Sequence, residues 1–196
     1  ALFVRFDDVV RNISDSVTRM FRSLPGYTPP PNIRSVDVYV IGSSCGGTGA
    51  GMFFDIANLS RQLIAQSALE AILQGHVFLP SCFSGTQVAL RSIQTNACAF
   101  LRTMELMQSD ALPAIQYPGL KTMEYPAPLF RRVHLISSVD VTGIRAGEIQ
   151  DVFESVALQL DLEITGASAR DMRSAADNDP ADFNNRPLGR LAVYSS

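Results

Sequence analysis

Residues 36–63 read VDVYVIGSSCGGTGAGMFFDIANLSRQL, and this stretch decides how the rest of the chain is interpreted. Five of the ten residues from Gly42 to Gly51 are glycine, and they lie between an apolar, β-branched segment and an amphipathic one. Glycine loses more backbone entropy on folding than any other residue, so the need for a turn does not explain this density. The glycines indicate that a ligand comes very close to the main chain.

The composition is that of a globular α/β or α+β protein. The chain has 196 residues, of which 46% are apolar and 18% charged, so it can bury a core and is not disordered. A net charge of −3 without a basic stripe excludes the usual footprint of a nucleic-acid binder. No apolar run approaches the roughly 20 residues of a membrane helix, and no signal peptide is visible. We therefore expect no membrane insertion and a cytoplasmic location.

The cysteines and histidines do not form a metal-binding pattern. Three widely spaced cysteines and two histidines give no recognisable zinc spacing. Free thiols fit a reducing cytosol. These five residues are Cys45, Cys82, Cys98, His76 and His134.

Predicted strands alternate with predicted helices along the chain. Apolar spacing predicts helices over residues 7–24, 51–73, 86–108 and 146–164, and strands over 36–41, 76–83, 131–138 and 189–196. Residues 109–130 are rich in proline and predict a surface excursion, and residues 166–186 are polar and predicted to be irregular.

This alternation predicts an α/β fold with three layers, in which a mostly parallel sheet carries helices on both faces. In such sheets ligands bind at the carboxyl ends of the strands, which is where the glycines follow strand 36–41. We expect one nucleotide-binding domain over residues 1–196. We expect this domain to be incomplete, because the chain opens on a helix rather than on a first strand with its own loop.

A strand, then glycines, then a helix N-terminus form an anion site, because free amides point outward and the helix end is partially positive. The segment is not a Walker A loop, since Thr48 replaces the required lysine and the only lysine of the chain is the distant Lys121. It is not a dinucleotide fingerprint either, because its last three glycines alternate with other residues. A nucleophilic Cys45 at a strand-to-helix elbow remains an alternative, although spacing identifies no complete set of partners for it.

The seven residues GGTGAGM at 46–52 resemble the tubulin signature, which tubulins share with the bacterial division protein FtsZ and with more distant bacterial tubulin-like proteins. The signature follows a strand and opens a helix, as it does in that family. The resemblance implies a tubulin/FtsZ nucleotide-binding domain, which is Rossmann-like. Cys45 stands where the family has glycine, alanine or serine. The residues implied to wrap the phosphates, with a hydroxyl from the threonine, are Gly46, Gly47, Thr48, Gly49, Ala50 and Gly51, with Cys45 beside them.

A second segment, PSCFSGTQVALR at 80–91, is similar to the FtsZ stretch P-F-x-F-E-G-x-x-R. It keeps the proline, a phenylalanine and the glycine. Ser84 replaces the family's acid, and Arg91 lies three residues later than expected. The resemblance implies that Ser84 and Arg91 contact the ribose and phosphates, while the alternative for Arg91 is a solvated helix arginine.

The helix that contains DVFESVALQL looks like the family helix whose aromatic ring stacks on guanine. The resemblance assigns this ring to Phe153, with plain core packing as its alternative. The family has an acid four residues later that reads the base edge, and here that position is Ala157. Guanine is what the family implies, and a preference for adenine stays open.

The segment DNDPADF resembles the family's acidic loop, which enters the nucleotide site of the neighbouring subunit. The resemblance implies that Asp179 and Asp182 polarise the water that attacks the γ-phosphate. The alternative is a surface loop rich in Asp, Asn and Pro.

Together these resemblances imply a cytoskeletal GTPase that binds GTP or GDP with Mg²⁺ and self-associates head to tail into filaments or a homo-oligomer. The alternative function is that of a tubulin-like structural or regulatory subunit of a larger assembly, which does not hydrolyse nucleotide.

Overall fold

The computed structural model describes residues 35–65, 69–83, 90–109, 112–115, 123–125, 127–139, 148–165 and 190–195. The predicted helix 7–24, the irregular segment 166–186 and the site candidates Ser84, Asp179 and Asp182 lie outside the described residues.

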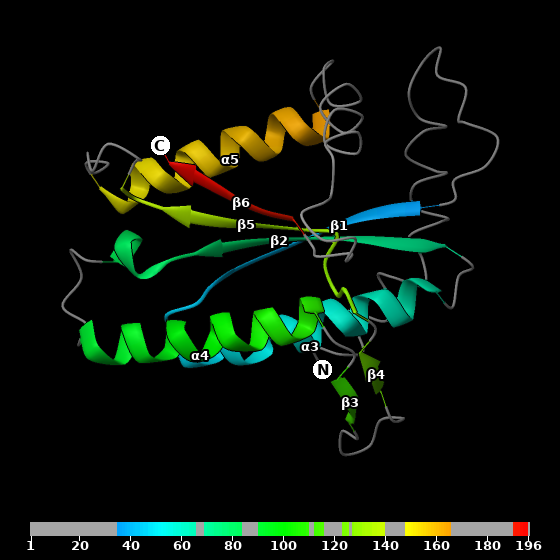
Figure 1. Cartoon of the computed structure of the whole chain (residues 1–196). Coiled ribbons are helices and arrows are strands. Elements are labelled where there is room, and N and C mark those ends of the chain that lie inside the picture. Colours follow the sequence, from blue (N-terminus) through cyan, green and yellow to red (C-terminus); the bar gives the residue numbers. More distant parts are fainter. Residues whose placement is uncertain are drawn as a thin grey trace, which may run out of the picture.

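The centre of the fold is a parallel sheet of four strands in the order β1-β2-β5-β6 (Figure 1). The strands are β1 (Ser35–Ser43), β2 (Glu70–Phe78), β5 (Arg132–Ser137) and β6 (Arg190–Ser195), and each neighbouring pair is parallel. Their carboxyl ends therefore lie along one edge of the sheet, called the carboxyl edge below. The predicted parallel sheet is confirmed.

Helices cover both faces of this sheet. Helices α3 (Gly47–Ala65) and α4 (Leu90–Ser109) pack on one face, and α5 (Ile149–Thr165) lies on the other (Figure 1). The predicted three-layer α/β architecture is thus confirmed. No helix in the described part of the chain is long and apolar enough to cross a membrane.

The predicted boundary between the first described helix and the second strand is wrong. Helix α3 ends at Ala65 rather than near residue 73, and β2 already begins at Glu70. The segment LEAIL has helical propensity, but all nine residues of β2 pair in register with β1, and tertiary pairing overrides a weak local preference. The end of the predicted strand is instead a short 3-10 helix, η1 (Pro80–Phe83).

The proline-rich residues 109–130 contain two short antiparallel strands, β3 (Leu112–Ile115) and β4 (Met123–Tyr125). Two hydrogen bonds tie β4 to α3: the Tyr125 hydroxyl donates to Asp55 Oδ1 at 2.7 Å, and Asn58 Nδ2 donates to the Glu124 carbonyl oxygen at 2.9 Å. The excursion is therefore anchored on the helix that follows the glycines.

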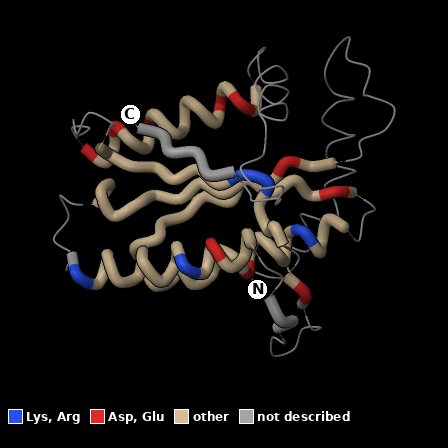
Figure 2. Tube along the Cα trace, viewed as in Figure 1, with Lys and Arg blue, Asp and Glu red and all other residues tan. Residues whose placement is uncertain are grey.

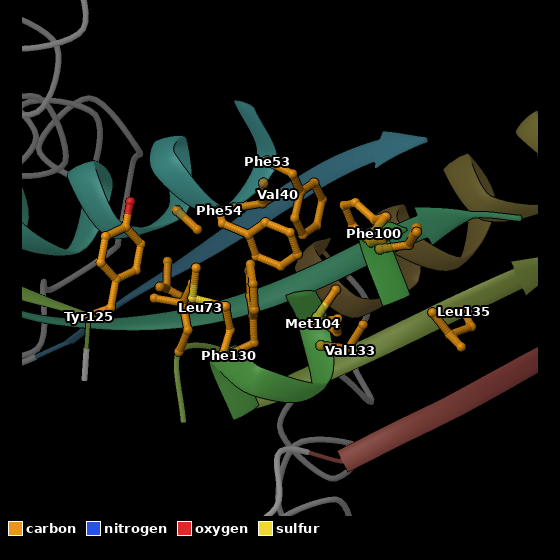
Figure 3. Packing of buried hydrophobic residues seen from close by; sticks show 14 residues of the cluster. Val40, Phe53, Phe54, Leu73, Phe100, Met104, Tyr125, Phe130, Val133 and Leu135 are labelled. Atoms are coloured by element: carbon orange, nitrogen blue, oxygen red, sulfur yellow. The ribbon is translucent and has the colours of Figure 1, made fainter. Parts of the chain in front are cut away.

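The main core lies between the sheet and helices α3 and α4 (Figure 3). Phe53 is at its centre, with ring centroids 5.3 Å from both Phe100 and Phe130. A Cβ added to Gly42 of β1 would lie 2.9 Å from the Phe53 ring, so this glycine lets α3 pack close to the strand. A second, smaller cluster joins α5 to the opposite face of the sheet.

Candidate functional site

The glycines lie at the carboxyl edge, where β1 passes into α3. Of the glycines in the GGTGAGM signature, Gly46 alone precedes the helix, because α3 begins at Gly47 and the Ala50 amide already donates to the Gly46 carbonyl at 3.0 Å. The sequence predicted a loop with a helix from about residue 51. The signature is instead the first turn of the helix, since none of its glycines adopts a left-handed φ that would break it.

Residues 43–45, called the stem below, are held firmly inside the protein. The Ser44 amide and hydroxyl both donate to the Phe78 carbonyl oxygen of β2 at 3.1 Å. The Cys45 amide donates to Ser43 Oγ at 3.0 Å, and Asn96 Nδ2 of α4 donates to the Cys45 carbonyl at 2.9 Å. Ser44 and Cys45 are buried. The stem therefore presents the following residues from a fixed position.

Residues 46–51, called the glycine segment below, are in contrast largely open to solvent. Gly46, Gly47, Thr48 and Gly49 are all exposed, and Ala50 is partly exposed. The first amides of an α-helix have no acceptor within the helix, and the first turn of α3 contains no acidic residue that would compete for them. The segment therefore offers hydrogen-bond donors and a partial positive charge to an anion.

Three of these glycines have no structural reason within the described fold to lack a side chain. A Cβ added to Gly46, Gly47 or Gly51 would meet nothing within 4 Å. At Gly49 it would lie 3.4 Å from the Ser43 carbonyl oxygen. Space that packing does not need is what a ligand lying against the backbone requires.

Phe153 lies at the same edge, on the opposite side of β2. Its ring meets that of Phe78 edge to face, with centroids 4.9 Å apart, and it is 38% exposed. The core contacts of α5 are made by Val152 and Val156, so Phe153 is not a plain core residue. Phe78 thus accepts hydrogen bonds from the stem through its carbonyl and contacts Phe153 through its ring. Ala157 is exposed on the same helix.

Arg91 lies in the exposed first turn of α4. Asn96, five residues further along this helix, contacts the stem. The N-terminal half of α4 therefore runs beside the glycine segment. The structure brings the glycine segment and Phe153 to one edge, whereas Ser84, Asp179 and Asp182 lie outside the described residues and stay predictions.

Sequence reasoning missed a group of hydroxyls at this edge. Ser81 Oγ and Ser137 Oγ are 3.0 Å apart, and Ser138 Oγ donates to the Ser81 carbonyl at 2.7 Å. These serines connect the ends of β2 and β5. The signal in the sequence is a serine directly after each predicted apolar run, in PSCF and LISS.

At the carboxyl edge, the charged residues belong to the starts of helices α4 and α5, which carry Arg91 and Asp151, rather than to the strands. The charged residues of the sheet strands lie in the halves that point away from this edge (Figure 2). In strands β1, β2 and β5 they are Asp37, Glu70 and Arg132. No strand carboxylate therefore opposes an anion at the glycine segment.

The two histidines form a buried stack in the sheet rather than lying in the stem region. His76 of β2 and His134 of β5 are paired in register, with ring centroids 4.4 Å apart. Burial, and then the charge of Arg132, lowers the pKa of His76 to about 4. Burial, then His76 and Arg132, lowers the pKa of His134 to about 3. Both rings are therefore neutral at pH 7.

Burial also raises the pKa of the Cys82 thiol.

A family model described as "Tubulin like" matches residues 1–194 of the chain. A search of curated proteins and a search of solved structures gave no match.

Proposed function

Because the chain belongs to the tubulin-like family, we propose that it binds GTP or GDP with Mg²⁺ at the carboxyl edge and assembles head to tail. The observation that carries this proposal is the glycine segment, where exposed helix-terminal amides adjoin space that no side chain needs. We assign the phosphates to residues 46–51 and the base to the exposed face of Phe153.

Each residue of the site has a distinct chemical task in this proposal. The amides of the glycine segment and the Thr48 hydroxyl hold the phosphates. Mg²⁺ binds mainly through phosphate oxygens, as is usual for this ion. Asp179 and Asp182 of a neighbouring subunit orient the attacking water. The protein then contributes positioning and charge stabilisation, which is how enzymes generally catalyse phosphoryl transfer.

The second candidate is a structural or regulatory subunit that binds nucleotide without hydrolysing it. Ala157 favours this function, because an exposed alanine occupies the position at which the family reads the base with an acid.

Calorimetric titration with GTP, GDP and ATP in the presence of Mg²⁺ tests the proposal. Gly47→Val places a branched side chain in the open space over the glycine segment, and Ala99→Val is the matched control on the exposed surface of α4. We expect Gly47→Val to lower GTP affinity by more than about tenfold and the control to bind as the wild type does. A preference for ATP would refute the guanine assignment, and no binding of any nucleotide by the folded wild type would refute the proposal.

A further inference from the structure

We propose that Asn96 of α4 is a positioning residue, which aims the first amide of the glycine segment at the bound anion. This inference rests on the proposed function. Its evidence is the hydrogen bond of 2.9 Å from Asn96 Nδ2 to the Cys45 carbonyl, which joins residues 51 positions apart. Within the described residues, the other hydrogen bonds of the stem join it to β2 or to itself, and this one comes from a helix.

The geometry of the peptide bond transmits this contact. The Cys45 carbonyl and the Gly46 amide belong to one planar trans peptide, in which C=O and N–H point in opposite directions. A donor that holds the carbonyl on the α4 side therefore turns the Gly46 N–H away from α4. Gly46 itself is exposed, and a Cβ added to it would meet nothing within 4 Å.

Glycine makes such an external restraint necessary. A residue without Cβ rotates freely about its backbone bonds, so the plane of this peptide is poorly fixed by Gly46 itself. Asn96 supplies the missing restraint from a rigid base, because Ile93, Ala97 and Phe100 of the same helix are buried. The open space for the anion therefore lies at the start of α3, whereas the orientation of the Gly46 amide is set by α4.

The Cys45 thiol reports the restraint without any nucleotide. Cys45 is only 8% exposed, so a stem that rotates more freely must admit an alkylating reagent more often. The chain contains its own references, because Cys98 is exposed and Cys82 is buried. Iodoacetamide labelling of each cysteine, followed by peptide mass analysis, gives the three rates separately.

Three variants separate positioning from folding. Asn96→Asp keeps the shape but replaces the donor by an acceptor, Asn96→His keeps a donor at a similar reach through Nδ1–H, and Gln94→Glu makes the same amide-to-acid change at an exposed position of α4. If Asn96→Asp fails to fold, Asn96→Ser, which is too short to make the contact, takes its place.

We expect Asn96→Asp to speed Cys45 alkylation and to weaken GTP binding, each by about tenfold. This factor corresponds to the loss of one hydrogen bond to a buried carbonyl. Both Asn96→His and Gln94→Glu should have the Cys45 alkylation rate and the GTP affinity of the wild type. The rates for Cys98 and Cys82 should not change. All measurements are made well below the melting temperature of each variant.

The positioning role would be refuted if Asn96→Asp and Gln94→Glu had the same Cys45 alkylation rate and the same GTP affinity. It would also be refuted if Asn96→Asp lowered only the melting temperature. It would also be refuted if Asn96→His lost as much as Asn96→Asp. If the wild type bound no nucleotide, the proposed function would fail, while the alkylation rates would still decide whether Asn96 orients the stem.

Discussion

Gly42 and Gly51 differ in what surrounds the side chain that each lacks. Gly42 faces the ring of Phe53, which is buried in the main core, whereas Gly51 faces open space within the first turns of α3. The sequence alone shows only that both positions are glycine. Their surroundings, a core ring in one case and open space in the other, become distinct only when α3 is docked on β1.

Alanine at these two positions should therefore change stability in opposite directions. Gly42→Ala forces a core ring to move and should lower the free energy of unfolding by about 1–3 kcal/mol. Gly51→Ala removes a glycine from a helix and should raise it by about 0.5–1 kcal/mol. Urea denaturation of both variants beside the wild type measures the two changes. A stabilised Gly42→Ala would show that Phe53 does not pack as described.

The stacked histidines make stability depend on pH. Their pKa values in the folded protein, about 4 for His76 and about 3 for His134, are below the 6.5 of an unfolded chain. The unfolded state therefore binds more protons below pH 6.5. The contribution of the two neutral histidines to the free energy of unfolding is fully present above pH 6.5. It is lost as the pH falls toward 4, at about 1.4 kcal/mol per pH unit for each histidine.

Replacing one of these rings should halve this slope. His76→Phe keeps an aromatic ring against His134 and removes two buried ring nitrogens that have no hydrogen-bond partner, so its stability at pH 7.5 should lie within about 1 kcal/mol of the wild type. Denaturation between pH 6.5 and pH 5, above the range in which carboxylates titrate, measures the slope. An unchanged slope in the variant would contradict the assignment.

Among single residues, the sequence was sufficient to locate the glycine segment, because its residues are adjacent in the chain and resemble a family motif. It was not sufficient to find Asn96 or the serines. Asn96 is one of several polar residues on a long helix, and what distinguishes it is a contact with residue 45. Such contacts depend on how helices are placed on the sheet, which local patterns do not contain.

At the scale of elements, the C-terminal end of α4 is fastened by one side chain. Gln108 Nε2 donates to the Phe130 carbonyl at 2.9 Å, and the Phe130 amide donates to Gln108 Oε1 at 2.8 Å. Both side chains are buried. These two hydrogen bonds fix the segment that leads into β5.

Gln108→Leu should accordingly lower the free energy of unfolding by about 2–4 kcal/mol, since it leaves a buried amide and a buried carbonyl without partners. Gln94→Leu, an identical change at an exposed position of the same helix, should have an effect within about 0.5 kcal/mol of zero. Thermal or chemical denaturation of the two variants gives the comparison. Equal effects would mean that the Phe130 backbone finds other partners.

On helix α5 the residue proposed to bind the base and the residues that pack on the sheet occupy different faces of the same turns. Phe153→Ala should weaken nucleotide binding and also remove the edge-to-face contact with Phe78, which contributes about 0.5–1.5 kcal/mol of stability. Val156→Ala, on the buried face, should cost about 2 kcal/mol of stability and leave affinity unchanged. Calorimetric titration and denaturation of both variants distinguish the two tasks. Unchanged affinity in Phe153→Ala would remove this residue from the site.

The elements themselves were predicted well in type and less well in extent. The strand at residues 36–41 is rich in β-branched residues, and the helix around Phe153 has amphipathic spacing. The segment LEAILQGHVF gives no equally clear signal, and its first half was assigned to a helix. Only the register with β1, from Ser35 opposite Glu70 to Ser43 opposite Phe78, fixes it as a strand, and register with a distant partner is not a local property.

For the whole molecule, the proposed assembly predicts activity that two subunits share. A variant with Asp182→Ala keeps its own nucleotide site, and a variant with Gly47→Val keeps its acids. Each alone should hydrolyse GTP slowly, whereas a mixture should recover activity, because the acids of one variant complete the site of the other. Phosphate release against protein concentration measures this. If the mixture is no more active than its parts, hydrolysis does not occur between subunits.

The three helices in the described part of the chain run in the same direction, so their dipoles are aligned. Helices α3, α4 and α5 all begin at the carboxyl edge and run 19, 20 and 17 residues away from it. Each contributes about half an elementary charge of opposite sign at its two ends, separated by about 25–30 Å. These three helices thus contribute aligned dipoles, which in the proposed assembly favour a copy stacked in the same direction over one that is inverted. Since salt screens such fields within about 8 Å at physiological ionic strength, the preference acts only as two copies meet, and it should be strongest in dilute buffer.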